Sequence, residues 1–137
     1  MILRPILRCE MRDENLNLLF ERYPKMFARK DHPGSWGGIY CGDGWFTLID
    51  TLCSSIQSYL NNNKNVEQVV VEQIKEKFGD LRFYCEGGDE TTYGMIWLAE
   101  SMSMHICEAC GNAGKIRGRS WYYTACDEHT NYGDKDE

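Results

Sequence analysis

Apolar residues recur at helical spacing in three segments of the chain. Residues 12–23 are expected to form one helix, and residues 44–60 carry a continuous apolar stripe that predicts a second. Asp43 is expected to cap this second helix, because its carboxylate can accept free amide hydrogens of the first turn. Asp89 is expected to cap a third helix that continues to about Met104.

Residues 66–86 are rich in β-forming side chains and predict a β-hairpin. A glycine-first turn at Gly79–Asp80 is the expected connection. Three cross-strand pairs follow from this turn: Phe78 with Leu81, Lys77 with Arg82, and Lys75 with Tyr84. Because strand side chains alternate, one face is expected in the core and the other at a solvent-facing or binding surface. The core face comprises Val70, Ile74, Phe78, Leu81, Phe83 and Cys85, and the other comprises Lys75, Lys77, Arg82 and Tyr84.

The order of these elements predicts an α+β fold, with helices packed on a β-hairpin and a small module at the C-terminal end. We expect residues 1–104 to form the core domain. Residues 105–137 are expected to form a zinc-binding module of the zinc-ribbon or treble-clef type, followed by an acidic tail. The glycine-rich segment 31–45 is expected to be a loop.

Composition narrows the class of protein. The chain has 137 residues and a net charge of −6, so a generally basic nucleic-acid surface is not expected. The N-terminal residues lack the apolar run of a signal peptide, and no segment approaches the roughly 20 apolar residues of a membrane span. We therefore expect a soluble, cytoplasmic protein without a membrane partner. In that reducing compartment, its seven cysteines do not indicate a disulfide framework.

Four residues near the C-terminus have the spacing of metal ligands. Cys107, Cys110, Cys126 and His129 form C-x2-C-x15-C-x2-H. Zn²⁺ favours four tetrahedral nitrogen and sulfur ligands, and structural sites fill all four positions with protein. Structural zinc is the favoured interpretation. A catalytic zinc is less favoured, because a catalytic site usually keeps one ligand position open. Also less favoured is the alternative that these are four unrelated residues in a reduced protein.

Two sets of residues are candidate binding surfaces. The first is expected to bind an anionic ligand or a partner protein, through charge on the hairpin and aromatic rings of the glycine-rich loop: Lys75, Lys77, Arg82, Tyr84, Trp36, Asp43 and Trp45. The second lies in the zinc module and would bind phosphates and stack bases if residues 114–119 are extended: Lys115, Arg117, Arg119 and Trp121. The alternatives are a solvated face for the first set and charge compensation for the second.

Three segments together resemble a family of small, mostly uncharacterised phage and prophage proteins. They are GDGWFTLIDTLC (42–53), QIKEKFGDLRFYCEGG (73–88) and CEACGNAGKIRGRSWYYTACDEH (107–129). Members combine a GxGW helix, a KFGxLRFY hairpin and a terminal C-x-x-C…C-x-x-H module. The resemblance implies a viral origin and action in the host cytoplasm, and it implies no activity.

The leading functional hypothesis is a non-enzymatic, zinc-stabilised phage accessory protein that acts by binding. Its expected partner is a host protein, with inhibition of host defence as one role, or an anionic nucleotide signal that it sequesters. The chain has no phosphate-binding loop, dinucleotide-binding glycine pattern, H-E-x-x-H or G-x-S-x-G. A nucleic-acid-binding zinc module and a phosphodiester hydrolase are the alternative hypotheses.

Overall fold

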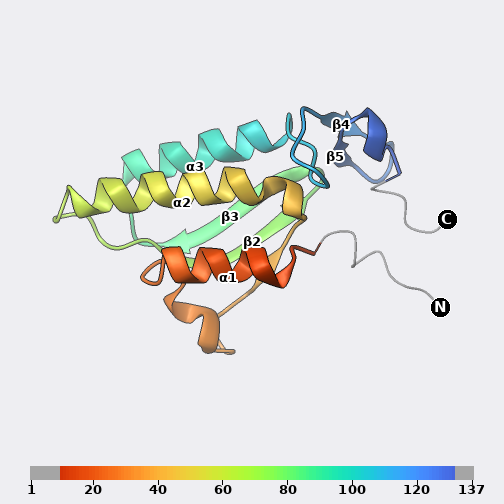
Figure 1. Ribbon diagram of the computed structural model, residues 1–137. Helices are drawn as coiled ribbons and strands as arrows, with labels where there is room; N and C mark the ends of the chain where they lie inside the picture. The colour runs from red at the N-terminus through yellow and green to blue at the C-terminus, as the bar shows by residue number, and fades with distance from the viewer. Residues whose placement is uncertain (1–9, 132–137) are drawn as a thin grey trace.

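The computed structural model describes residues 10–131, and the fold is α+β, as predicted (Figure 1). Cys9 and residues 132–137 of the expected tail lie outside the described range. Among the described residues, no helix combines the length and apolar character needed to cross a membrane. The elements in chain order are α1 (Asp13–Arg22), the short 3₁₀ helix η2 (Ala28–Asp31), β1 (Ile39–Tyr40), η3 (Asp43–Trp45), α2 (Phe46–Asn61), β2 (Val70–Lys77), β3 (Asp80–Glu86), α3 (Glu90–Ser103), β4 (Lys115–Arg117), β5 (Tyr123–Ala125) and η4 (Asp127–His129).

Two small sheets organise the molecule. In the larger sheet β1 pairs parallel with β2, and β2 pairs antiparallel with β3, whereas β4 and β5 form a separate antiparallel pair. Helices α2 and α3 run side by side in opposite directions, and the β4–β5 pair lies beyond one end of this layer (Figure 1). The side chains buried between helices and sheet include Trp45, Ile49, Ile56, Val71, Ile74 and Leu81.

Helix α3 covers the outer edge of β3. The amide of Leu81 donates to the Ser103 hydroxyl at 2.9 Å, and the amide of Phe83 donates to the Glu100 carboxylate at 3.0 Å. These amides point away from β2, so without α3 they would form an open sheet edge. Asp89 caps α3 as predicted, because its carboxylate accepts the Thr92 amide while the Thr92 hydroxyl accepts the Asp89 amide.

The predicted hairpin is present, but its predicted register is wrong. The chain turns at Phe78–Gly79, where φ is 54° and 92°, as a two-residue turn with both central residues left-handed requires. Three observed pairs replace the expected ones: Lys77 with Asp80, Lys75 with Arg82, and Gln73 with Tyr84. The error shifts partners by two residues, so the basic side chains keep their face. Phe78, expected in the core, lies at the turn and is 68% exposed.

Two further expectations need correction. A register shift between Val71 and Gln73 turns the start of β2, so Val71 is fully buried while Val70 is only partly covered. The segment expected to be only a loop contains β1, which extends the sheet beyond a hairpin. This strand is too short for periodicity to reveal.

Candidate metal centre and binding pocket

The four predicted metal ligands lie together. Their ligand atoms all fall within 4.8 Å of one another, so Cys107, Cys110, Cys126 and His129 could hold a metal ion. The sulfurs of Cys110 and Cys126 are 3.8 Å apart. Nδ1 of His129 lies 3.7 Å from the Cys107 sulfur and 3.2 Å from the Cys126 sulfur. Metal–sulfur bonds of about 2.3 Å in a tetrahedron give sulfur–sulfur edges of about 3.8 Å, so the spacing fits a four-coordinate ion.

Local backbone turns bring these ligands together. The first pair lies on a tight turn, in which the Gly111 amide donates to the Cys107 carbonyl at 2.8 Å and Gly111 adopts a φ of 87°. The left-handed backbone of Gly111 explains why glycine follows the second cysteine. Strands β4 and β5 then return the chain to Cys126, and η4 carries His129 to the same point.

The environment of Cys107 prepares its sulfur for a metal. Burial opposes ionisation of this thiol, but the backbone amides of Cys126, Cys110 and Ala109 donate toward its sulfur and lower its pKa to about 7. A thiolate is the form that binds metal, so the amides preorganise the ligand.

The group of four candidate ligand residues, called the metal cluster below, is attached to the core by the segment GDGW, residues 42–45. The amide of Gly44 donates to the Glu108 carbonyl at 2.7 Å, and the indole nitrogen of Trp45 donates to the Ile106 carbonyl at 2.9 Å. A Cβ on Gly44 would overlap the Cys107 carbonyl oxygen and lie 2.5 Å from that of Glu108. The absence of a side chain at Gly44 therefore allows the two backbones to approach.

Glu108 is a buried carboxyl group at this junction. It is 1% exposed, and its Oε2 accepts the Gly42 amide at 2.9 Å. Burial, and then the nearby Glu76 carboxylate, raise the pKa of Glu108 to about 8 despite that hydrogen bond. The backbone amide of Glu108 also donates to the backbone carbonyl of Thr124. The Thr124 hydroxyl in turn donates to the Gly79 carbonyl. Polar contacts thus connect the cluster to both the GDGW segment and the β2–β3 turn.

Three residues predicted to bind a ligand come from separate segments and line one pocket of about 580 Å³: Trp36, Lys75 and Tyr84. Arg29 shares the pocket and forms ion pairs with Glu72 and Glu86. Lys75, by contrast, makes no ion pair with any residue that the structure describes. The pocket therefore contains one lysine without an ion pair to a described residue, beside Glu72, whose carboxylate pairs with Arg29.

The same sheet face continues beyond the pocket. Tyr40, Lys75 and Arg82 occupy neighbouring positions across β1, β2 and β3, so their side chains share one face. Arg82 forms an ion pair with Asp80 at 3.1 Å. Lys77 lies over the Phe78 ring. This face thus carries basic and aromatic side chains together with the acidic Asp80.

Asp43 and Trp45 lie elsewhere. Trp45 is fully buried and holds the metal cluster, so its ring is not available to stack on a ligand. Asp43 forms an ion pair with Arg12 at 3.0 Å and accepts hydrogen bonds from the Arg12 amide and the Asn15 side chain. It therefore connects η3 to the start of α1 rather than capping α2, whose first turn has no side-chain cap.

The basic row predicted in the metal module does not form one extended face. Strand β4 ends at Arg117, and the left-handed Gly118, with a φ of 97°, redirects the chain before Arg119. Arg117 donates to the Ala125 carbonyl at 2.9 Å and pairs with Asp127 at 2.7 Å. Lys115, Arg119 and Trp121 are exposed. Arg117 thus stabilises the β4–β5 pair.

The remaining described cysteines lie in or against the core. Cys41 and Cys53 are fully buried, and Cys85 is partly buried. Burial raises the pKa of the Cys53 thiol, and it raises that of Cys85 to about 11. The Cys53 and Cys85 thiols therefore stay protonated at neutral pH, which agrees with a packing role.

Sequence reasoning missed Glu108, the buried residue that joins the metal ligands to the GDGW segment. Glu108 lies inside the predicted metal motif, where a glutamate between two cysteines is expected to be exposed to solvent. Tyr40 was expected in a loop and is exposed on β1. No spacing rule identifies the role of Glu108, because it depends on contact with the distant Gly42.

Comparisons with protein-family models, with curated proteins and with solved structures found no match for this chain.

Proposed function

We propose that this chain is a zinc-stabilised binding protein that captures an anionic small molecule of the nucleotide type. The observation that carries the proposal is the convergence of Trp36, Lys75 and Tyr84 in one pocket, on a fold whose terminal module is held by the four metal ligands.

Three sulfurs and one imidazole nitrogen are ligands that zinc prefers, and the interligand distances suit its tetrahedral geometry. The order of a cysteine turn, a hairpin and a short helical turn is typical of treble-clef modules. Protein fills all four ligand positions, which favours a structural ion over a catalytic one. The module is too small to bury much apolar surface, so zinc would supply folding free energy.

The pocket has the properties of an anion site with room for a base. Lys75 supplies positive charge and makes no ion pair with a described residue, whereas the pocket's Glu72 is paired with Arg29. Arg82, which pairs with Asp80, lies beside Lys75 on β3. Trp36 and Tyr84 supply aromatic surface for stacking. Its volume of about 580 Å³ lies within the range typical of small-molecule sites.

The test is calorimetric titration of the zinc-loaded protein with ATP and with a cyclic dinucleotide. We expect at least one of them to bind, and Lys75→Ala to weaken that binding about tenfold by removing a pocket lysine that makes no ion pair with a described residue. Lys64→Ala is the matched control, since Lys64 is exposed in the turn after α2. Failure of both nucleotides to bind, or equal weakening by the two variants, would falsify the proposal.

Short single-stranded oligonucleotides distinguish the nucleic-acid hypothesis. If the chain binds such an oligonucleotide, that binding should be weakened by Lys115→Ala and Arg119→Ala and should fall steeply with salt. That result would indicate that the binding surface is the metal module and not the pocket. The viral origin, the host partner and the hydrolase alternative stay predictions from the sequence.

A further inference from the structure

The larger sheet has two edges, and α3 covers the one at β3. The other edge is β1, which comes first in the strand order. The Gly38 carbonyl accepts the Ile74 amide at 3.0 Å, and Ile39 is the register partner of Ile74. Because the peptide groups of successive strand residues point to opposite sides, the amide and the carbonyl of Ile39 point away from β2.

These two backbone groups of Ile39 make no hydrogen bond with any residue that the structure describes. The residue is nevertheless only 8% exposed. Backbone amides and carbonyls that are removed from water are nearly always paired in folded proteins. One strand residue with both groups free can exchange two hydrogen bonds with one residue of an added antiparallel strand. The β1 edge therefore has the chemistry to bind an extended peptide.

A pocket of about 340 Å³ lies beside this edge, and Ile39 forms part of its wall. Asp13, Leu16 and Phe20 line the pocket from α1, where spacings of three and four residues place them on one side of the helix. Trp36 adds to the apolar wall, with its ring centroid 6.2 Å from that of Phe20. A side chain of a peptide added at β1 therefore has a partly apolar pocket beside it.

The charge of this pocket indicates which side chain it takes. Of the described residues that line it, Glu10 and Asp13 are acidic and none is basic. Neither carboxylate makes an ion pair or a hydrogen bond with a described residue. Lys75, which is the register partner of Tyr40, lines the pocket of the proposed function instead. The β1 pocket is thus complementary to a cationic side chain.

Two basic side chains close to the β1 pocket already have acidic partners. Arg12 pairs with Asp43 at 3.0 Å. Lys30, which lies over the Phe20 ring, pairs with Asp31 at 2.9 Å. These ion pairs leave the two pocket carboxylates to a cation from outside the described part of the chain.

We infer that the β1 edge binds an extended segment of a partner protein, which adds as a strand beside Ile39 and places an arginine or lysine side chain near Glu10 and Asp13. Backbone hydrogen bonds supply general affinity in this mode, and the pocket selects the side chain. The half-exposed Tyr40 ring gives the cation an aromatic neighbour. Among described lining residues, the two pockets share only Trp36, so this inference does not depend on the proposed function.

The test is titration of the isotope-labelled, zinc-loaded protein with the peptide acetyl-Thr-Val-Arg-Val-Thr-amide, followed by NMR of the backbone amides. We expect the Ile39 amide signal to move downfield, because this amide gains an acceptor. A peptide with glutamate in place of arginine should bind at least tenfold more weakly, because the pocket carboxylates repel it. Methylation of the three central backbone nitrogens should have a similar effect, because it removes the donors to the Ile39 carbonyl.

The double variant Glu10→Gln and Asp13→Asn should weaken binding of the arginine peptide at least tenfold. Both positions are exposed, so folding, checked by circular dichroism and zinc content, should be unchanged. Glu90→Gln is the matched control, since Glu90 is an exposed acidic residue in the first turn of α3, and it should bind the peptide as the wild type does.

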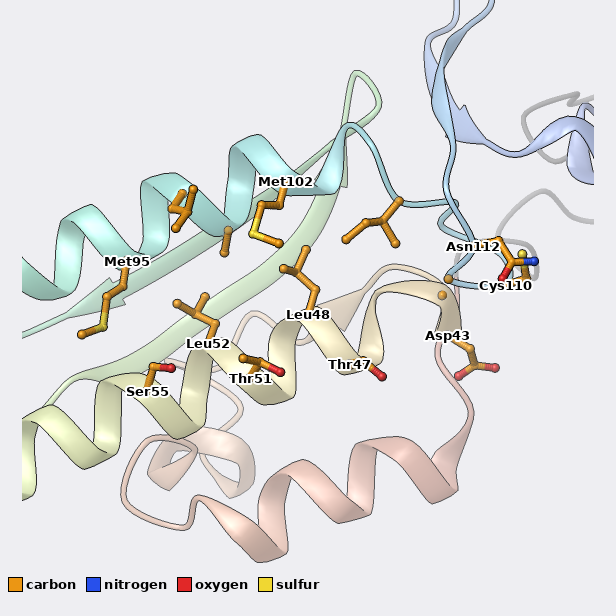
Figure 2. Close-up of a pocket in the computed structure, with 15 residues that line it drawn as sticks. Asp43, Thr47, Leu48, Thr51, Leu52, Ser55, Met95, Met102, Cys110 and Asn112 are labelled. Carbon is orange, nitrogen blue, oxygen red and sulfur yellow. The ribbon is translucent and has the colours of Figure 1, made fainter.

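The apolar groove between α2 and α3 is another surface on which this peptide could bind. Leu48 and Leu52 face Met95 and Met102 across this groove, and Thr51 lies on its α2 side (Figure 2). Thr51→Arg should therefore leave binding unchanged. The inference is overturned if this variant weakens binding, if the arginine peptide fails to bind or to shift the Ile39 amide, or if the methylated peptide or the double variant binds as tightly.

Discussion

Gly44 determines how closely the metal cluster approaches the core. Its amide donates to the Glu108 carbonyl, and a side chain at this position has no room beside the carbonyl oxygens of residues 107 and 108. The neighbouring Trp45 then uses its indole nitrogen to hold Ile106. The apolar stripe of residues 44–60 was expected to pack in the core. Its first residues also hold the turn that carries Cys107 and Cys110.

Gly44→Ala should destabilise the junction. Forcing the two backbones apart is expected to cost about 1–3 kcal/mol of unfolding free energy, as other overpacked sites do. It should also speed metal loss to a chelator, because the ligand turn is no longer supported. Denaturant unfolding and a colorimetric zinc-release assay measure the two effects.

The control for this variant is Gly34→Ala, at an exposed glycine whose added Cβ would meet nothing within 4 Å. It should change neither quantity. If Gly44→Ala behaved like the control, the close approach at the junction would not matter for stability.

At the scale of elements, helix α3 does more than contribute apolar surface. Two of its polar side chains accept backbone amides of β3, so the helix completes an otherwise open sheet edge. Ser103 is fully buried there, and its hydroxyl also donates to the Glu100 carbonyl at 2.6 Å.

Ser103→Ala should destabilise the chain by about 1–3 kcal/mol, because the Leu81 amide would be buried without an acceptor. Ser101→Ala, two residues away on a more open part of the same helix, should have little effect. Thermal unfolding of the two variants makes the comparison. Equal melting temperatures would mean that α3 does not protect the strand through this hydroxyl.

The sequence predicts the elements better than their partners. Helical periodicity located α1, α2 and α3, because a one-sided apolar stripe is a local property. The hairpin register was missed because Phe78 takes a left-handed conformation that is unusual for a bulky residue. Strand β1 was missed because two residues carry no period. The metal ligands were found because their spacing is itself a local signal, whereas Glu108 acquires its role only through contact with Gly42.

At the scale of the whole molecule, we expect the core of helices and sheet and the small C-terminal module to depend on different sources of stability. Helix α2 and the sheet bury a continuous apolar core, whereas the module buries Cys107, Ala125 and Cys126 with few apolar neighbours. Loss of the metal should therefore affect the two parts unequally.

Cys107→Ser, or treatment with a strong chelator, should unfold residues 105–131 while leaving α2 protected. Hydrogen exchange followed by mass spectrometry measures both regions in one experiment. We expect amide protection to fall in the β4–β5 region and to persist from residue 48 to 60. Uniform loss across the chain, or full protection of the module without metal, would contradict this division of stability.

The central claim is that a closed zinc centre holds the terminal module of a binding protein. X-ray absorption spectroscopy at the zinc edge tests it most directly, on purified protein whose metal content has been determined. The account predicts one zinc per chain, with three sulfur ligands at about 2.3 Å and one nitrogen at about 2.0–2.1 Å. A chain that folds without stoichiometric zinc, or a zinc ion with a water oxygen in place of one of these four ligands, would contradict it.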